Sequence, residues 1–157
     1  ARDGSAKVIT ADALPALRQR YHDRSIVFTN GCFDVFHAGH AHLLTEAKAF
    51  GDKLVVGVNS DQSITALKGP SRPVMPQEAR LKVLASMEAV DYIVVFDEST
   101  PMNLLEKLRP DVLVKGGEHT VATVVGSDLV LGYGGIVKLV DMMPTLSSTN
   151  AIAKLST

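Results

Sequence analysis

The sequence predicts a doubly wound α/β fold built on a five-stranded parallel sheet. Short runs rich in Val and Ile are apolar on both faces, which is typical of parallel strands that are covered on both sides. Amphipathic segments separate these runs, and strands that alternate with helices form parallel sheets. The chain has 157 residues, which suits a single domain with one sizeable core. We therefore expect one domain, residues 1–157.

Five apolar runs are expected to form the strands. The first, "SIVFTN", precedes a turn that contains glycine, and the others recur along the rest of the chain. The expected strands are residues 25–30, 53–59, 92–96, 112–116 and 135–140.

The segments between the strands have helical patterns with recognisable ends. An amphipathic segment, "ALPALRQRY", precedes the first strand, and residues 40–51 carry an apolar stripe that ends at a glycine stop. Residues 75–87 open with a proline at a helix-starting position, and residues 100–110 have an N-cap threonine followed by a proline. The residues concerned are Leu43, Leu44, Ala47, Phe50 and Gly51, then Pro76, then Thr100, Pro101 and the terminating Pro110.

The bulk composition excludes several classes of protein. Sixteen basic and seventeen acidic residues give a net charge of −1, and only 5% of residues are aromatic, so no nucleic-acid-binding surface is indicated. No apolar run approaches the roughly 20 residues of a membrane span, and no signal peptide is visible. Cys32 is the single cysteine, which fits a reducing compartment such as the cytoplasm. Residues 1–6 lack periodicity and are expected to be flexible or vector-encoded.

The turn after the first strand, "FTNGCFDVFHAGHAHLL", has the features of a phosphate cradle. In an open parallel sheet, ligands bind beyond the carboxyl ends of the strands. Gly31 frees the backbone to turn, and the helix that follows presents its positive dipole end. His37 and His40 are three residues apart and share a face on a first helical turn. Gly39 between them removes a side chain where a ligand would approach closely.

This histidine pair has two other interpretations. The imidazoles could be helix-start residues satisfied by backbone groups, or part of a zinc site that includes the nearby His42. Neither a second cysteine nor a carboxylate stands at a ligand-like spacing, and neither a dinucleotide nor a P-loop glycine motif is present. The phosphate cradle is therefore favoured, while His22 and His119 are expected to be surface residues.

The segment "GCFDVFHAGH" resembles the nucleotidyltransferases that carry an H-x-G-H signature. The resemblance extends over residues 25–155 through "VNSD", "LKGPSRPV", "EARLKVLASMEAVDYIV", "DVLVKGG" and "SST". Together these motifs resemble the D-glycero-D-manno-heptose 1-phosphate adenylyltransferases, which make ADP-heptose for lipopolysaccharide or related glycans. The resemblance implies a Rossmann-like nucleotidyltransferase fold, ATP and heptose 1-phosphate as substrates, Mg²⁺ supplied with ATP, and a homo-oligomer. A sugar kinase is sometimes fused to this domain, and here we expect it to be a separate protein.

The reaction so implied needs positioning more than acid–base chemistry. A sugar phosphate has a second pKa of about 6 and is largely dianionic at neutral pH, so it can attack the α-phosphorus in line without a general base. It does need alignment and cancellation of the repulsion between two anions. Cys32 is accordingly expected to be a small buried residue rather than a nucleophile.

Several side chains are candidates for these roles. His37, His40 and Lys68 are the expected catalytic residues, with Lys68 and Arg72 on a flap that is mobile until phosphates bind. Asp34 either fixes the loop through backbone N–H bonds or orients Mg²⁺, and Arg80 either pairs with Glu78 or Asp91 or, as the resemblance implies, faces the nucleotide. The expected nucleotide-binding residues are Thr29, Asn30, Gly31, Cys32, Phe33, Asp34, Gly39, Asn59, Asp61, Arg80, Gly116, Ser147, Ser148 and Thr149, and the sugar-phosphate-binding residues are Arg72 and Lys115.

Two alternative functions stay open. One is a CTP-dependent cytidylyltransferase that acts on glycerol 3-phosphate or another polyol phosphate. Related cytidylyltransferases carry Arg and Glu before a Gly-Ile-Ser-Thr-Thr run, whereas this chain has "MPTLSSTN", which argues against that branch. The other is a nucleotide-sensing module without catalysis, which would tolerate the loss of Lys68 and Arg72.

Overall fold

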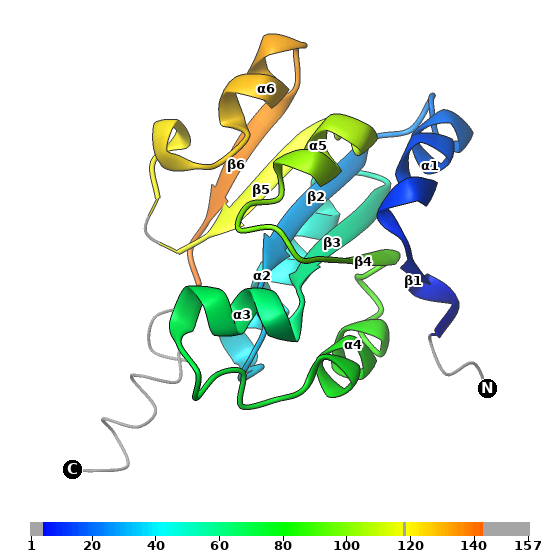
Figure 1. Ribbon diagram of the computed structural model, residues 1–157. Coiled ribbons are helices and arrows are strands. Elements are labelled where there is room, and N and C mark those ends of the chain that lie inside the picture. The colour runs from blue at the N-terminus through cyan, green and yellow to red at the C-terminus, as the bar shows by residue number, and fades with distance from the viewer. Residues whose placement is uncertain (1–4, 118, 143–157) are drawn as a thin grey trace.

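A parallel sheet with helices on both faces forms the molecule (Figure 1). The computed structural model describes residues 5–117 and 119–142. The predicted fold class is confirmed, but the strand number is wrong, because the sheet has six strands in the order β1-β4-β3-β2-β5-β6. The additional strand, β1 (Val8–Ile9), is only two residues long and pairs with β4 at the edge. A strand this short has no periodicity to recognise.

The other strands lie within one residue of their expected positions. They are β2 (Ile26–Gly31), β3 (Lys53–Asn59), β4 (Tyr92–Phe96), β5 (Val112–Gly116) and β6 (Ile136–Val140). β2 is central, and its Val27 is in register with Leu54 of β3 on one side and Val112 of β5 on the other. The chain order reverses between β2 and β5, so the switch point of the sheet lies at the carboxyl ends of these two strands.

The helices differ more from expectation. The structure has α1 (Leu14–Arg20), α2 (Ala38–Ala49), α3 (Asp61–Lys68), α4 (Gln77–Ala85), α5 (Met102–Leu108) and α6 (Ser127–Gly132), with 3₁₀ turns η1 (Ser5–Lys7), η2 (Ala11–Ala13) and η3 (Val121–Thr123). Neither α3 nor α6 was predicted. Each is short, and each buries only two residues, which leaves no clear apolar stripe in the sequence.

Several expected helix ends are shifted. Pro101 rather than Thr100 is the N-cap of α5, and Pro76 is the N-cap of α4 rather than its first residue. Phe50 caps the end of α2 and remains 37% exposed, so the buried stripe stops at Ala47.

Alternating strand residues divide the core into two apolar layers. Val27 packs with α2 and α4 on one face, while Ile26 and Phe28 pack with α1, α5 and α6 on the other. Figure 1 shows α2 on the opposite side of the sheet from α1 and α5. This double covering explains the continuous apolar runs in the sequence.

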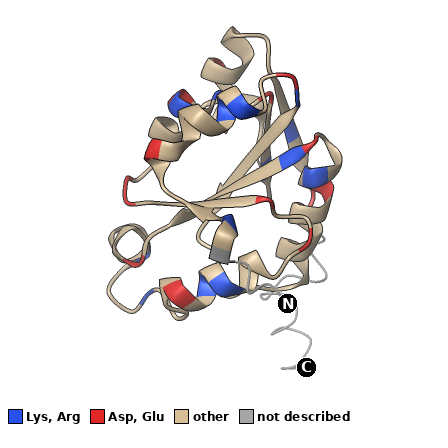
Figure 2. Ribbon diagram, turned by 90° about the vertical axis from the view of Figure 1, so that its right-hand side faces the viewer, with Lys and Arg blue, Asp and Glu red and all other residues tan. Residues whose placement is uncertain are grey.

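Among the residues coloured in Figure 2, Lys and Arg are interspersed with Asp and Glu. At the amino ends of the strands, buried backbone amides are bound by carboxylates. Asp111 accepts the N–H of Ile26 at 2.8 Å and pairs with Arg18 at 2.9 Å. Among the described residues, no helix has the length and apolar character that crossing a membrane requires.

Candidate active site

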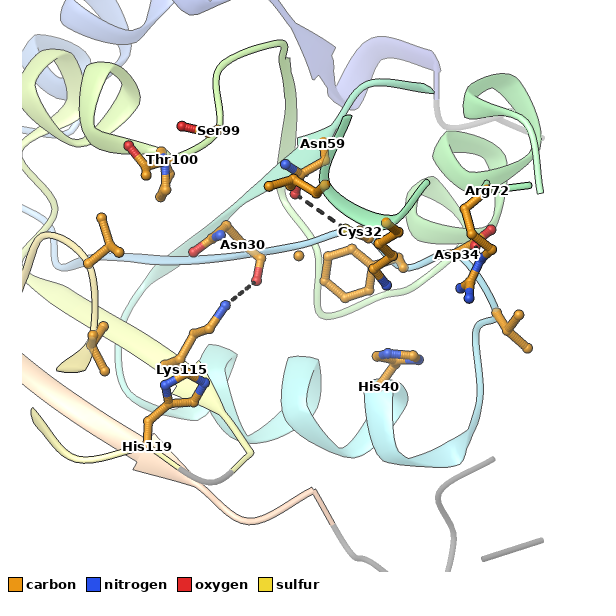
Figure 3. Close-up of a pocket in the computed structure, with 18 of the residues that line it drawn as sticks. Asn30, Cys32, Asp34, His40, Asn59, Arg72, Ser99, Thr100, Lys115 and His119 are labelled. Atoms are coloured by element: carbon orange, nitrogen blue, oxygen red, sulfur yellow. Dashed lines mark hydrogen bonds and ion pairs between the residues drawn. The ribbon is translucent and has the colours of Figure 1, made fainter. Parts of the chain in front are cut away.

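A cavity of about 680 Å³ lies at the carboxyl ends of the central strands (Figure 3). It extends from the turn after β2 to α3 on one side and to the loop after β5 on the other. Most of the sequence-predicted site residues line it: Asn30, Gly31, Cys32, Phe33, Asp34, His37, His40, Asn59, Lys68, Arg72 and Lys115. Residues distant in sequence are thus brought to one place by the parallel topology.

Five predicted nucleotide-binding residues do not line this cavity: Thr29, Gly39, Asp61, Arg80 and Gly116. Thr29 is fully buried in β2, and its hydroxyl has no partner among the described residues. Gly116 faces the chain itself, since a Cβ there would lie 2.5 Å from the Met142 sulfur. Ser147, Ser148 and Thr149 lie outside the described residues.

The two histidines cap α2 and each other. His37 is the N-cap residue, and its Nδ1 accepts the N–H of Gly39 at 3.0 Å. His40 Nδ1 accepts the N–H of His37 at 3.1 Å, which closes a capping box made of imidazoles. The ring centroids lie 4.0 Å apart, as expected for residues that share a face. The bonds expected for histidines satisfied by backbone groups are thus observed at one nitrogen of each ring, and the phosphate cradle stays a prediction.

These bonds fix the tautomer of both rings. A nitrogen that accepts an N–H cannot carry a proton, so a neutral ring holds its proton on Nε2. Burial, together with electrostatic repulsion of a proton by His37 and Lys68, lowers the pKa of His40 from 6.5 to about 4. His40 is therefore neutral at pH 7 and offers an Nε2–H donor. A donor that needs no added proton suits an anionic ligand at neutral pH.

The backbone around the histidines is closely packed. Phe33 has a φ of 50°, a left-handed conformation that is costly for a bulky residue. Its ring contacts His40, with centroids 5.4 Å apart. A Cβ on Gly39 would lie 2.7 Å from the Met142 carbonyl oxygen and 2.8 Å from His37 Cε1. A close approach at Gly39 is thus made by the protein itself, and the approach of a ligand there stays a prediction.

Asp34 holds the loop between α3 and α4. Its side chain is 2% exposed and accepts the N–H groups of Val74 and Met75 at 2.8 and 2.9 Å, together with Arg72 Nε at 2.5 Å. Although burial alone would raise its pKa, these donors and the Arg72 charge hold the pKa below its usual value. Asp34 does accept backbone N–H groups, as one of its two expected roles requires, but from the loop between α3 and α4 rather than from its own turn. The expected free flap is corrected, because the loop is tethered, and Lys68 belongs to the end of α3.

Arg80 is a buried guanidinium that joins four segments. It is 1% exposed and donates to the carbonyl oxygens of Met75, Cys32 and Asn59 and to Asp61, at 2.7–3.1 Å. It pairs with Asp61 rather than with Glu78 or Asp91, which corrects that expectation. Arg80 does not line the cavity itself. It stabilises the cavity wall through its bonds to Cys32 and Asn59, which do line it.

Lys115 spans the switch point. Its ammonium donates to the Asn30 carbonyl oxygen at 3.5 Å, which links the ends of β5 and β2 (Figure 3). Burial lowers the pKa of Lys115. Cys32 is half-buried rather than buried and its thiol contacts Asn59 Oδ1 at 3.7 Å, where it lines the cavity beside the predicted phosphate-binding turn.

Sequence reasoning missed part of the cavity wall. His119 was expected to be a plain surface residue, and it is exposed, yet it also lines the cavity. The loops after β4 and β5 supply most of the others, and their position after parallel strands was the available signal. The unpredicted lining residues are Val35, Leu67, Ser99, Thr100, Pro101, His119, Thr123, Val124 and Val125.

The described residues do not form a metal site of their own. No group of three or more His, Cys, Asp or Glu side chains converges in this part of the chain. Both oxygens of Asp34 are already bound. The donor set therefore does not fit a Mg²⁺ held by protein ligands, and Mg²⁺ commonly binds through substrate phosphates and water instead.

A capped helix start with anion-binding donors at the switch point of a parallel sheet defines a nucleotide-binding α/β domain. The family model described as cytidylyltransferase-like matches residues 28–153. The chain belongs to this cytidylyltransferase-like family.

Two curated relatives are similar over nearly the whole chain. The "Bifunctional protein HldE" of Syntrophotalea carbinolica is 52% identical over 137 residues, which are 87% of this chain and 28% of that protein. The protein of the same name from Geobacter sulfurreducens is 50% identical over 155 residues, or 98% of this chain and 32% of that protein. The chain thus spans about a third or less of the length of these relatives.

Solved structures share the fold. The lipopolysaccharide core biosynthesis protein from Thermoplasma volcanium matches with a TM-score of 0.59 and 27% identity, covering 75% of this chain and 95% of that one. Pantoate-beta-alanine ligase from Francisella tularensis matches with a TM-score of 0.62 and 14% identity, covering 85% of this chain and 66% of that one. The second likeness concerns the fold alone.

Proposed function

We propose that this domain is an adenylyltransferase that converts heptose 1-phosphate and ATP to ADP-heptose and pyrophosphate. The observation that carries the proposal is the imidazole pair, whose Nδ1 atoms are bound to backbone and whose Nε2–H groups remain as donors beside the cavity. The motifs that resemble the heptose branch support the choice of sugar. Similarity of about 50% to HldE proteins and to a protein named for lipopolysaccharide core biosynthesis supports it further.

The proposed mechanism requires only binding and alignment from the protein. His37 and His40 donate to the triphosphate, where preorganised N–H groups stabilise the charge that develops in the transition state. Lys68, Arg72 and Lys115 line the same cavity and offset the repulsion between two phosphates. When bound with ATP, Mg²⁺ would supply further charge neutralisation on the phosphate oxygens. The sugar phosphate then attacks the α-phosphorus in line, and pyrophosphate leaves.

A pyrophosphate-release assay tests this proposal. ATP and CTP are each offered with the two anomers of heptose 1-phosphate and with glycerol 3-phosphate, with and without Mg²⁺. We expect Mg²⁺-dependent turnover of ATP with one heptose 1-phosphate. Equal or better use of CTP would show that the adenylyltransferase assignment is wrong.

A cytidylyltransferase is the second candidate, because the matching family description names that activity. The glycerol 3-phosphate arm of the same assay with CTP identifies it. ATP binding without turnover of any sugar phosphate would instead indicate a nucleotide-sensing module.

We also propose that the described residues belong to one nucleotidyltransferase domain that acts in the cytoplasm as a homo-oligomer. Light scattering on the purified chain tests the oligomer, with a monomer mass at assay concentration as the opposing result.

A further inference from the structure

The carboxylate of Asp34 reaches a loop 38–41 residues away. Its Oδ1 accepts two backbone amides, from Val74 and Met75, and its Oδ2 accepts Arg72 Nε. A buried carboxylate with three donors is a fixed point, because each oxygen is satisfied and any displacement would expose a desolvated charge. The loop between α3 and α4 therefore has its position set by the turn after β2.

Among residues 5–117 and 119–142, the Arg72 side chain bonds only to Asp34, through Nε. A guanidinium has five N–H donors in a planar fork, and Asp34 uses the one on Nε. The Arg72 side chain is 34% exposed and lines the cavity, on the side away from Lys115 (Figure 3). Anchoring Nε fixes the plane of the fork, so the remaining donors have a defined direction at a small cost in side-chain entropy.

The charges around Arg72 favour its use as an oriented hydrogen-bond donor to an anion. Two amide dipoles already share the Asp34 charge, so Arg72 is not fully neutralised by its partner. Lys68 lines the same cavity and adds a second positive charge to that of Arg72. A bidentate fork beside a point charge is an arrangement that binds phosphate with directional preference.

We propose that Asp34 is a positioning residue that orients the guanidinium of Arg72 toward the phosphate of the sugar substrate. The inference rests on the proposed function and deepens it. Asp34 does not touch the substrate, and it acts through Arg72. Its effect should therefore vanish once Arg72 is absent, whereas a generally structural residue or a metal ligand would keep its effect.

A double-mutant cycle tests the proposal. Asp34→Asn keeps an oxygen for the two amides but removes the charge that pairs with Arg72. We expect KM for heptose 1-phosphate to rise about tenfold, the usual size for a hydrogen bond to a charged group, with KM for ATP nearly unchanged. Arg72→Met should raise the same KM at least as much, and the double variant should match Arg72→Met alone. Arg72→Lys should recover only part of the loss.

The matched control is Asp111→Asn at the opposite end of the sheet. Asp111 also accepts a backbone N–H and pairs with an arginine, but it does not line the cavity. This variant should lose stability without changing either KM. If Asp34→Asn raises KM by the same factor with and without Arg72, or shifts the Mg²⁺ concentration that gives half-maximal rate, the proposal is overturned. Wild-type KM in Asp34→Asn would overturn it as well.

The same variants are titrated with inorganic phosphate by calorimetry, which needs no turnover. Binding should weaken in Asp34→Asn and Arg72→Met and should not weaken further in the double variant. Without turnover of any sugar phosphate by the wild-type protein, this pattern would contradict the proposed function while sustaining the role of Asp34. Additive weakening would contradict the role of Asp34 whatever the reaction.

Discussion

The connection after β2 and the connection after β3 both line the cavity, but they are built differently. In residues 31–40 the functional side chains are held by amides of their immediate neighbours, since His37 and His40 bond within three residues. In residues 60–80 the two arginines, Arg72 and Arg80, depend on contacts with Asp34 and Cys32, 38–48 residues away. In the first connection, neighbouring residues position the functional side chains. In the second, contacts with distant parts of the chain position them.

This difference predicts how each connection fails. A change in the first should remove binding donors and cost the stability of one helix cap. A change at either arginine of the second should disturb buried or partly buried charges, so stability and function are lost together. Four measurements test this contrast.

Arg80→Met should have the largest effect on stability. Removing the guanidinium leaves three carbonyl oxygens and Asp61 without their donor, and breaking a buried charge network typically costs about 3–5 kcal/mol. Urea unfolding measures the loss. Arg109→Met is the control, because Arg109 is exposed above the Tyr133 ring. A loss below about 1 kcal/mol in Arg80→Met would show that the second connection does not depend on this residue.

His37→Ala and His37→Asn should separate capping from binding. Alanine removes the cap, which costs about 1 kcal/mol, whereas asparagine is a good N-cap and should keep most of that stability. Neither offers the imidazole Nε2–H, so kcat should fall about 10²–10³-fold in both. Activity retained in the alanine variant together with a large loss of stability would make His37 purely structural.

The pH dependence of stability should carry the signature of His40. Its folded pKa of about 4 lies below the usual 6.5, so between these values the unfolded state binds more protons and stability falls as the pH is lowered. The loss can reach about 3 kcal/mol at pH 4. Unfolding of wild type and His40→Gln from pH 4 to 7 isolates this slope, and identical slopes would contradict the neutral imidazole.

Lys68→Ala should have the smallest effect on stability and a clear effect on activity. Lys68 is exposed at the end of α3, so unfolding should change by no more than about 0.5 kcal/mol. Loss of a charged contact to phosphate should lower kcat/KM about 10–100-fold, and Lys68→Arg should rescue only part of it, because a planar fork does not replace a point charge. Unchanged kinetics in Lys68→Ala would leave this residue as a solvated helix end.

The same contrast explains what could be predicted from sequence. The strands and the histidine turn follow from contiguous patterns, namely apolar runs and a three-residue spacing on a helix start. The anchoring of the loop by Asp34 and the burial of Arg80 are long-range, and nothing in the neighbouring residues encodes them. The loop was therefore expected to be free, and Arg80 was expected either to pair with Glu78 or Asp91 or to face the nucleotide.

Helix α3 and the far wall of the cavity show a second limit. Only Ser63 and Ile64 of α3 are buried, so its helical pattern is weak, although Ser60 caps it through the N–H of Ser63. Thr100 was interpreted as a helix cap, and instead it lines the cavity one residue before the N-cap. Local sequence propensity predicts that a residue such as Thr100 lies near a turn. Whether that residue lines the cavity depends on the arrangement of the strands in the sheet.

The most direct test of the central claim is the tautomer of the two histidines, because their dual use as cap and donor underlies the proposed mechanism. Long-range ¹H–¹⁵N NMR of imidazole-labelled protein at pH 7, with and without ATP, reports the protonation of each ring nitrogen. We expect Nδ1 of His37 and of His40 to carry no proton, and only the Nε2 signals to shift strongly when ATP is added. A proton on Nδ1 of either ring, or Nε2 signals indifferent to ATP, would contradict the account.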